Sequence, residues 1–229
     1  MSRPVRIQYP DAMRGKKISI SILIFFFLLL ISVSASGVDI SKYPETIAVL
    51  RELYKAEVTA CKTYSAFAQK ALEEKHDSVA TLFRALRTSE SIHARNFKHI
   101  LEALGGTVEE MPESDIKVGN TKENLEYALD EELSEIDTRY PEFIKRIKQE
   151  ANEAGIRDIT YAWKAELQHR NLIKKMRSAT GFFFGRIVQK LKGADRYFVC
   201  QRCGSTLFEL PKDTCVICGS PVSMYKEVK

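Results

Sequence analysis

A four-residue pattern, Glu-x-x-His, occurs twice in this chain and constrains its fold more than any other feature. It occupies residues 90–93 (Glu-Ser-Ile-His) and residues 166–169 (Glu-Leu-Gln-His). Residues three apart on an α-helix lie on one face, roughly 60° apart around the axis. Each copy therefore presents a carboxylate and an imidazole in the same direction. Two such helices facing each other, with single carboxylates from two more, form a site for a pair of metal ions.

Apolar periodicity predicts the first half of a helical bundle. Apolar residues recur at steps of three or four along residues 45–76 and again along residues 77–104, with only a short hinge between them. These two helices should be antiparallel neighbours. Residues 105–121 show no such period, and when extended they reach about 56 Å, more than the roughly 42 Å length of the second helix. One long crossover of this kind is typical of ferritin-like four-helix bundles.

The second half of the bundle should contain two more helices. The third should begin with Thr121 as its N-cap, be kinked or broken at Pro141 and end at Gly155. The fourth should occupy residues 156–176. The expected fold class is therefore mainly α: a ferritin-like four-helix bundle with one long crossover, followed by a small four-cysteine β module.

Five glutamates and two histidines fall on the helix faces that should be buried. They are Glu57, Glu90, Glu132, Glu135, Glu166, His93 and His169. An isolated ionised carboxylate is very costly in an apolar interior, so such groups are paired or bind metal. Carboxylate-rich sites with two imidazoles suit iron or manganese better than copper or zinc. We therefore expect a two-metal site. His76 and His99 lie off this pattern and are interpreted as surface or structural residues, and Cys61 as a small buried apolar residue.

Four of the five cysteines form two Cys-x-x-Cys pairs near the C-terminus, each followed by glycine. The pairs are Cys200 with Cys203 and Cys215 with Cys218, separated by 11 residues. Two such knuckles provide a tetrahedral four-thiolate site for iron or zinc. Two disulfides are a further alternative in an oxidising compartment. Iron is favoured, because a redox centre beside a two-metal site has a use that a structural zinc lacks.

The N-terminal region carries an apolar run, residues 18–35, preceded by Arg14, Lys16 and Lys17 and ending in Val-Ser-Ala. This order of positive flank, apolar core and small residues is typical of a signal peptide, with Met13 as an alternative start. The rival interpretation is an uncleaved membrane anchor, because the run reaches the lower end of a membrane span. Either one predicts a protein that is exported (periplasmic or extracytoplasmic) or anchored facing outside the cytoplasm.

The distribution of charge gives no case for a nucleic-acid partner. The formal net charge is +5, but residues 1–35 contribute +4 of it through five basic residues and Asp11. The rest of the chain is therefore nearly neutral, whereas a nucleic-acid-binding domain needs a basic stripe on its folded surface.

Composition divides the chain into four expected parts. Residues 1–35 are a signal peptide or membrane anchor, residues 43–178 a ferritin-like metal-binding domain, residues 179–196 a linker and residues 197–229 the four-cysteine module. Three consecutive phenylalanines at 182–184 are unusual in a linker, and we expect them to pack on the bundle or on a partner subunit.

From about Tyr43 to Lys229 the chain resembles the rubrerythrins. The resemblance rests on these features, in chain order: Glu57 with Tyr64, Glu90-x-x-His93, Asn124-Leu125, Glu132-x-x-Glu135, Tyr140-Pro141, Glu166-x-x-His169 and the two rubredoxin-like cysteine knuckles. Ferritins and bacterioferritins share the bundle but lack the appended cysteine module. The chain departs from the family at Ala56 and Glu131, where rubrerythrins often have glycine, and we expect Glu131 to be a solvated neighbour. The apolar leader is also atypical, because most relatives are cytoplasmic.

The resemblance implies a non-haem di-iron peroxidase that serves in oxidative-stress defence. Glu90 and Glu166 would bridge the two irons, and Glu57 and Glu132 would be terminal ligands. His169 would hold one iron. The four-cysteine module would hold a third iron and pass electrons to the di-iron site.

The remaining implied roles concern turnover. The second iron would exchange Glu135 for His93 when reduced, and Tyr64 and Tyr140 would lie near the site. Hydrogen peroxide would be reduced to water with electrons from a donor protein or reductase. The protein would be a homodimer or larger, with one subunit's cysteine module near its partner's di-iron site because the two centres of one chain are too far apart.

Two alternatives remain open. One is a ferroxidase or iron-storage protein of the ferritin-like type. The other is a rubredoxin-type electron carrier in which the bundle only positions the four-cysteine iron. Glu135 favours the peroxidase, because a simple ferroxidase site has no need of this extra ligand.

Overall fold

The computed structural model describes residues 42–109, 115–179 and 196–229. The expected leader, residues 1–35, and the phenylalanines at 182–184 lie outside this part of the chain, so the expectations for them stay predictions. No helix within the described part is long and apolar enough to span a membrane.

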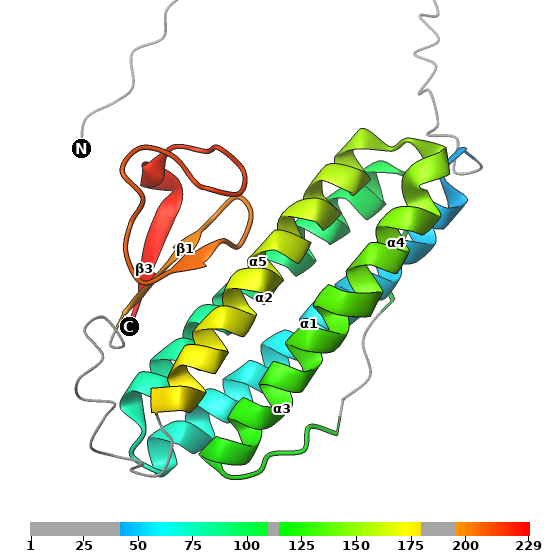
Figure 1. Ribbon diagram of the computed structural model, residues 1–229. Helices are drawn as coiled ribbons and strands as arrows, with labels where there is room; N and C mark the ends of the chain where they lie inside the picture. The colour runs from blue at the N-terminus through cyan, green and yellow to red at the C-terminus, as the bar shows by residue number, and fades with distance from the viewer. Residues whose placement is uncertain (1–41, 110–114, 180–195) are drawn as a thin grey trace, which may run out of the picture. The chain divides into compact units, whose positions relative to one another are not determined.

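Four helical rods make up the larger part of the described structure (Figure 1). Their bounds are α1 Pro44–Glu73; α2 Asp77–Ala103; α3 Thr121–Ser134 with the π-helical turn η2 Glu135–Arg139 and α4 Tyr140–Ile147; and, after a 3-10 turn η3 Lys148–Glu150, α5 Glu153–Ala179. The amide and hydroxyl of Thr121 both donate to Glu74 Oε2, at 2.8 and 2.7 Å, so α3 begins at the end of the bundle where α1 finishes. Since α2 runs away from that end, the chain crosses the length of the bundle between α2 and α3. The predicted ferritin-like bundle with one long crossover is confirmed.

The hinge between α1 and α2 begins earlier than the periodicity predicts. Lys75 adopts a left-handed conformation, with φ of 63°. The N–H of His76 donates to the carbonyl of Ala71 at 2.7 Å, and that of Lys75 to Leu72 at 2.9 Å. These are the paired hydrogen bonds of a Schellman ending. The first helix therefore ends at Glu73, and α2 returns beside it as the predicted antiparallel neighbour.

The N-cap of α3 is Asn120 rather than the predicted Thr121. The Asn120 side chain accepts the N–H of Glu123 at 3.0 Å, and the Glu123 carboxylate accepts the N–H of Asn120 at 2.8 Å. This reciprocal pair is a capping box. Thr121 is instead the first residue of α3, and its hydroxyl donates to the carboxylate of Glu74, directly after the end of α1. Asn124 stabilises the same turn by bonding both the N–H and the carbonyl of Gly119.

The third rod is interrupted directly before Pro141 and continues beyond it. The α-helix widens into η2, and the proline occupies the first turn of α4, where its missing N–H is tolerated. The sequence predicted that this rod ends at Gly155, but it ends earlier. The rod ends at η3, where Ala151 is left-handed, and Asn152 then accepts the N–H of Gly155 at 2.8 Å. Gly155 therefore lies in the first turn of α5.

The C-terminal module is a three-stranded antiparallel sheet with the order β2-β1-β3. Its strands are β1 Tyr197–Cys200, β2 Thr206–Leu207 and β3 Tyr225–Val228, with a 3-10 turn η5 Val222–Met224 before the last strand. Register pairs Val199 with Thr206 and Cys200 with Tyr225. The sheet supports the first cysteine knuckle and confirms the predicted small β module.

Two apolar clusters fill the bundle. One contains Phe67, Phe83 and Leu86, and the other contains Leu53 and Phe97. Both clusters draw on α1 and α2, and each continues onto the opposite rods. The buried carboxylates and histidines of the bundle lie at the level between them. They therefore occupy a polar layer between two apolar clusters.

Candidate metal centres

Six of the seven metal-ligand candidates converge in this polar layer. Each is at most 2% exposed: Glu57 on α1, Glu90 and His93 on α2, Glu132 on α3, and Glu166 and His169 on α5. The seventh candidate, Glu135, begins η2 and has a side chain that is 17% exposed. All four rods therefore contribute, as the spacing of the carboxylates predicts.

The six residues form two overlapping groups of four. One group is Glu57, Glu90, His93 and Glu166; the other is Glu90, Glu132, Glu166 and His169. Within each group the candidate ligand atoms all lie within 4.8 Å of one another. Glu90 and Glu166 belong to both groups. Carboxylates shared in this way can bridge two cations, while the other members complete each ion's separate set of ligands.

Several buried polar atoms in this layer have no hydrogen-bond partner. Both carboxylate oxygens of Glu90, the Oε2 atom of Glu132 and Nδ1 of His93 are orphaned. His93 Nδ1 lies 2.9 Å from Glu90 Oε2 and 3.1 Å from Glu166 Oε1, but not in hydrogen-bonding geometry. Orphaned buried polar groups are costly, and two hard cations with mixed oxygen and nitrogen ligands would satisfy them.

Two tyrosines anchor the carboxylates that belong to only one group. The hydroxyl of Tyr140 donates to Glu57 Oε1 at 2.7 Å, and that of Tyr64 donates to Glu132 Oε1 at 2.8 Å. Each hydrogen bond leaves the other carboxylate oxygen free. Hydrogen bonds to ligand side chains fix their orientation and tune metal affinity. The two tyrosines thus lie beside the site, and they contact its outer carboxylates.

Burial and charge perturb the titration of this layer. Burial, reinforced by neighbouring carboxylates, raises the pKa of Glu57 and Glu132 well above the usual carboxyl value. Burial alone would lower the pKa of His93 and His169, but the surrounding carboxylates raise it well above the usual imidazole value. Burial alone would also raise the pKa of Glu166, yet the two imidazoles lower it. Without metal the layer therefore retains protons, which bound cations must displace.

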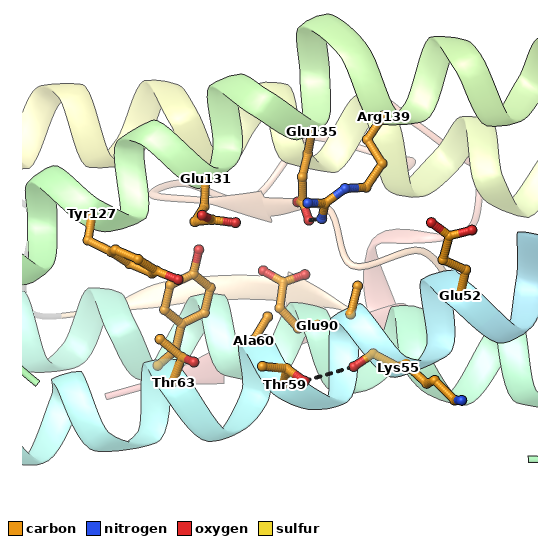
Figure 2. A pocket seen from close by; sticks show the side chains of 12 residues that line it. Glu52, Lys55, Thr59, Ala60, Thr63, Glu90, Tyr127, Glu131, Glu135 and Arg139 are labelled. Atoms are coloured by element: carbon orange, nitrogen blue, oxygen red, sulfur yellow. Dashed lines mark hydrogen bonds and ion pairs between the residues drawn. The ribbon is translucent and has the colours of Figure 1, made fainter. Parts of the chain in front are cut away.

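A cleft of about 420 Å³ leads from the surface between α1 and the third rod to Glu90. Figure 2 shows Glu135 and Arg139 facing each other on the third rod, with Glu90 on the opposite side of the cleft. Glu135 Oε1 accepts a hydrogen bond from Arg139 Nη1 at 2.6 Å. The two residues that depart from the rubrerythrin pattern, Ala56 and Glu131, both line this cleft. Glu131 is half-buried there and belongs to neither group of candidate ligands among the described residues.

The four module cysteines form a second candidate centre. Their sulfurs lie within 4.8 Å of one another, and all four cysteines are free thiols. Cys200 Sγ lies 3.8 Å from Cys218 Sγ, and Cys203 Sγ lies 3.5 Å from Cys215 Sγ. A tetrahedral ion with bonds of about 2.3 Å separates its ligands by about 3.8 Å. The spacing therefore fits a four-thiolate metal site and not a pair of disulfides.

The two knuckles have the same backbone geometry. In the first, the N–H of Gly204 donates to the carbonyl of Cys200 at 2.9 Å, and in the second Gly219 donates to Cys215 at 2.9 Å. Both glycines are left-handed, with φ of 79° and 71°. A Cβ atom at Gly219 would meet nothing within 4 Å, whereas one at Gly204 would collide with the ring nitrogen Nε2 of His93. The glycine of the first knuckle therefore lies directly against α2, whereas the glycine of the second has open space beside it.

The module also contacts the Nε2 atoms of both candidate ligand histidines, on the side of each ring away from the carboxylates. Nε2 of His93 lies 3.2 Å from the carbonyl oxygen of Cys203, and Nε2 of His169 lies 3.4 Å from Thr206 Oγ1. If Nδ1 of His93 binds a metal, its Nε2–H donates to the Cys203 carbonyl, the usual arrangement for a ligating histidine. These contacts form within one chain, so the expectation that one chain's two centres are too far apart is wrong here.

Sequence reasoning did not identify the residues that hold the module in place. Ser89 Oγ donates to the carbonyl of Gly204 at 2.7 Å, and Thr206 N–H donates to Gln168 Oε1 at 2.9 Å. Arg202 pairs with the buried Asp158 at 2.9 Å. Ser89 and Gln168 each lie beside a ligand position on their helix, but neither carries a recognisable motif.

The residues interpreted as lying outside the sites have mixed environments. His99 is exposed and His76 is half-buried, and neither belongs to a group of candidate ligands in the described chain. Cys61, predicted to be a small buried apolar residue, is half-buried, and its Sγ lies 3.5 Å from the Arg87 carbonyl oxygen. Burial raises the pKa of the Cys61 thiol to about 12, so it stays protonated.

Comparison with known proteins gives a consistent result. Residues 48–177 match the protein-family model described as Rubrerythrin. Rubrerythrin-2 of Clostridium acetobutylicum is 26% identical over 180 residues, which cover 76% of this chain and 91% of the relative. A putative rubrerythrin of Methanocaldococcus jannaschii is 27% identical over 198 residues, covering 81% and 93%. The solved structure of fully reduced, all-ferrous nigerythrin has a TM-score of 0.68 at 23% identity, covering 80% of this chain and 86% of that one.

Proposed function

The chain belongs to the rubrerythrin family, and on that premise we propose that it reduces hydrogen peroxide to water. Its two centres are a di-iron site in the bundle and a rubredoxin-like iron site in the module. A pair of ferrous ions can supply the two electrons that, with two protons, convert one peroxide into two waters. The family consists of oxidoreductases, and a peroxidase would serve in oxidative-stress defence.

One observation carries this proposal: two four-ligand groups share Glu90 and Glu166, and an open cleft ends at Glu90. The shared carboxylates would bridge the irons, and Glu57 and Glu132 would be terminal ligands held by their tyrosines. A small peroxide can reach Glu90 from solvent without displacing the apolar interior. The tyrosine hydroxyls and the imidazoles are the nearest groups able to hold or donate protons there.

The two histidines and Glu135 complete the proposed ligand set. His169 would bind one iron through Nδ1, and His93 would bind the other through Nδ1 in the ferrous state. Glu135 would replace His93 when the iron is oxidised, because a carboxylate favours the ferric ion and a neutral imidazole suits the ferrous one. Exchange between them limits the change of charge in the buried layer.

We further propose that electrons arrive through the module. The Cys203 carbonyl contacts His93 directly, so the four-cysteine iron and the di-iron site are joined through one backbone group and one imidazole. The chain would need an external donor, either a small electron-transfer protein or a reductase. Because this contact forms within one chain, a homodimer or larger assembly is not required for it.

Peroxide turnover by the purified, iron-loaded protein tests the proposal. The parent should consume peroxide repeatedly while a chemical reductant lasts, and Glu90→Gln should lose both the di-iron centre and the activity. Glu102→Gln is the matched control, because Glu102 is an exposed glutamate on the same helix. A ferroxidase or iron-storage protein would instead accumulate oxidised iron without repeated turnover. A pure electron carrier would keep its activity in Glu90→Gln.

The cellular location is a separate proposal that rests on residues 18–35. We expect the mature protein to be exported with the leader cut near Ala35, or to stay anchored through the uncut run. N-terminal sequencing and fractionation after native expression distinguish the two. A freely soluble cytoplasmic protein with an intact leader would refute both.

A further inference from the structure

Glu135 and Arg139 form an ion pair at the cleft, and the proposed function gives Arg139 no role. Glu135 Oε1 and Arg139 Nη1 are 2.6 Å apart, and their side chains are 17% and 34% exposed. Glu135 belongs to neither four-ligand group, although Glu57, Glu90 and Glu166 from other elements all act on it electrostatically. The carboxylate is therefore near the di-iron site but engaged elsewhere.

The backbone places this pair. Both residues lie in η2, which begins at Glu135 and ends at Arg139. Residues four apart on a helical surface are neighbours, and a charge-assisted pair between them is strong when it is sheltered from water. π-helical turns of this kind occur frequently at functional sites. The widened turn therefore keeps the guanidinium beside the carboxylate, on the wall of the cleft.

The cleft provides the space in which Glu135 can move. Both Glu135 and Arg139 line it, and it extends to Glu90 (Figure 2). A change of side-chain rotamer would therefore carry the carboxylate through open space and not through packed apolar groups. What opposes that change is the bond to Arg139.

We propose that Arg139 is a positioning residue, a latch that competes with the metal for Glu135 and holds this carboxylate outside the di-iron site. The inference rests on the proposed function of that site. With the latch closed, the second ion has the ligand set that contains His93. With the latch open, Glu135 becomes available as an additional ligand, so Arg139 sets how readily the site reaches its carboxylate-rich form.

Metal binding without redox chemistry tests the latch. The four-cysteine site is first filled with zinc, and the bundle is then titrated with Co²⁺, whose visible bands weaken as its coordination number rises. Arg139→Met should bind the second Co²⁺ about tenfold more tightly, with weaker bands, because groups around a ligand typically change metal affinity by roughly 10–100-fold. Arg139→Lys keeps the charge and should stay close to the parent.

Two further variants separate the latch from other effects. Glu135→Gln in the Arg139→Met background should abolish the gain, because the carboxylate released by the loss of Arg139 is then absent. Lys55→Met removes another cation of the same cleft, one that pairs with Glu109 and not with Glu135, and should also have no effect.

The latch proposal is overturned by any of three results: unchanged Co²⁺ affinity in Arg139→Met, an equal gain in Lys55→Met, or a gain in Arg139→Met that persists when Glu135→Gln is added. Because cobalt does not turn over peroxide, the result holds even if the peroxidase proposal fails. Failure to bind two Co²⁺ ions in the parent would count against the di-iron assignment. For the iron-loaded protein, Arg139→Met should lower the midpoint potential, since an added carboxylate favours the ferric state.

Discussion

At the scale of single residues, the site consists of carboxylates and imidazoles that are each costly to bury but that together can bind two metal ions. Each outer carboxylate has one oxygen held by a tyrosine and the other left for a cation: Tyr140 holds Glu57, and Tyr64 holds Glu132. The tyrosines come from rods other than those of their carboxylates. Correct packing of the bundle therefore sets the orientation of the ligands before any metal arrives.

Removing one of these hydroxyls should weaken one of the two ions. We expect Tyr140→Phe to reduce the affinity for the more weakly held metal about tenfold, because the Glu57 carboxylate loses its fixed orientation. Tyr127→Phe is the control, since Tyr127 lines the same cleft but is 52% exposed. Fe²⁺ titration under anaerobic conditions measures the effect. Equal affinities in the two variants would show that the Tyr140 hydroxyl does not position Glu57.

At the scale of elements, the two cysteine knuckles share one backbone geometry but have different neighbours. Gly204 and Gly219 are both left-handed, yet only Gly204 is pressed against α2, where a Cβ would lie 2.5 Å from Ser89 Oγ. The backbone of the first knuckle at Gly204 therefore contacts the bundle directly, and that of the second at Gly219 does not.

This difference provides a matched pair of substitutions. Gly204→Ala and Gly219→Ala should both cost about 1–2 kcal/mol of left-handed strain, but only Gly204→Ala should undock the module. The N–H of Thr206 donates to Gln168 across the docking surface, so its hydrogen exchange reports docking. We expect fast exchange at Thr206 in Gly204→Ala and slow exchange in Gly219→Ala. Similar exchange in both variants would show that Gly204 does not control docking.

Local sequence rules predicted the elements but not all of their ends. The helical period and the depth of Glu57, Glu90 and Glu166 depend only on spacing along one helix, so they were predictable. The end of α1 and the start of α3 depend on which side chain captures an exposed backbone group. Thr121 and Asn120 both fit a cap by residue type, and the hydrogen bonds between Asn120 and Glu123 in the folded structure decide in favour of Asn120.

The parts of the site that could not be predicted come from contacts between distant segments. Nothing in the sequence places Gly204 against Ser89, 115 residues away. Arg139 follows Glu135 by four residues, but the sequence does not show that both lie in a π-helical turn and pair on the wall of a cleft. The spacing of the ligand motifs was informative because each motif is local to one helix.

At the scale of the whole molecule, bundle, metals and module depend on one another. The inner nitrogens of His93 and His169 face the carboxylates, and their outer nitrogens face the module. Tyr197 and Val199 of β1 also join the apolar cluster of the bundle. Loading the di-iron site should therefore stabilise the entire described structure, because bound ligand shifts folding by mass action.

Stability of the metal-free protein should fall as the pH rises. The folded chain raises the pKa of Glu57 and Glu132 above 4.5 and of both histidines above 6.5. A raised pKa means that the folded state binds the proton more tightly than the unfolded state. The resulting stabilisation is complete at pH values below the unfolded-state pKa, and it is lost as the pH rises through the folded-state pKa. The pKa of Glu166 is lowered, so this group makes stability increase with pH, but only below about pH 4.5.

Thermal unfolding provides the measurement. The metal-free protein should melt at a higher temperature near about pH 5.5 than near about pH 8, and the stabilisation by added metal should be larger at the higher pH, where fewer protons must be displaced. The doubly substituted Glu57→Gln, Glu132→Gln protein is the control and should lose much of the dependence. A metal-free melting temperature that rises over this interval would contradict the prediction.

The central claim is that peroxide oxidises the di-iron site, which then draws electrons from the four-cysteine iron. Rapid mixing of anaerobically reduced, iron-loaded protein with excess hydrogen peroxide tests it most directly, by following the red colour of the oxidised four-cysteine iron. The colour should return quickly in the parent and in Glu102→Gln. In Glu166→Gln, which loses a bridging carboxylate but keeps the module, it should return far more slowly. Equally fast return of the colour in Glu166→Gln would show that peroxide oxidises the module directly, and would contradict the account.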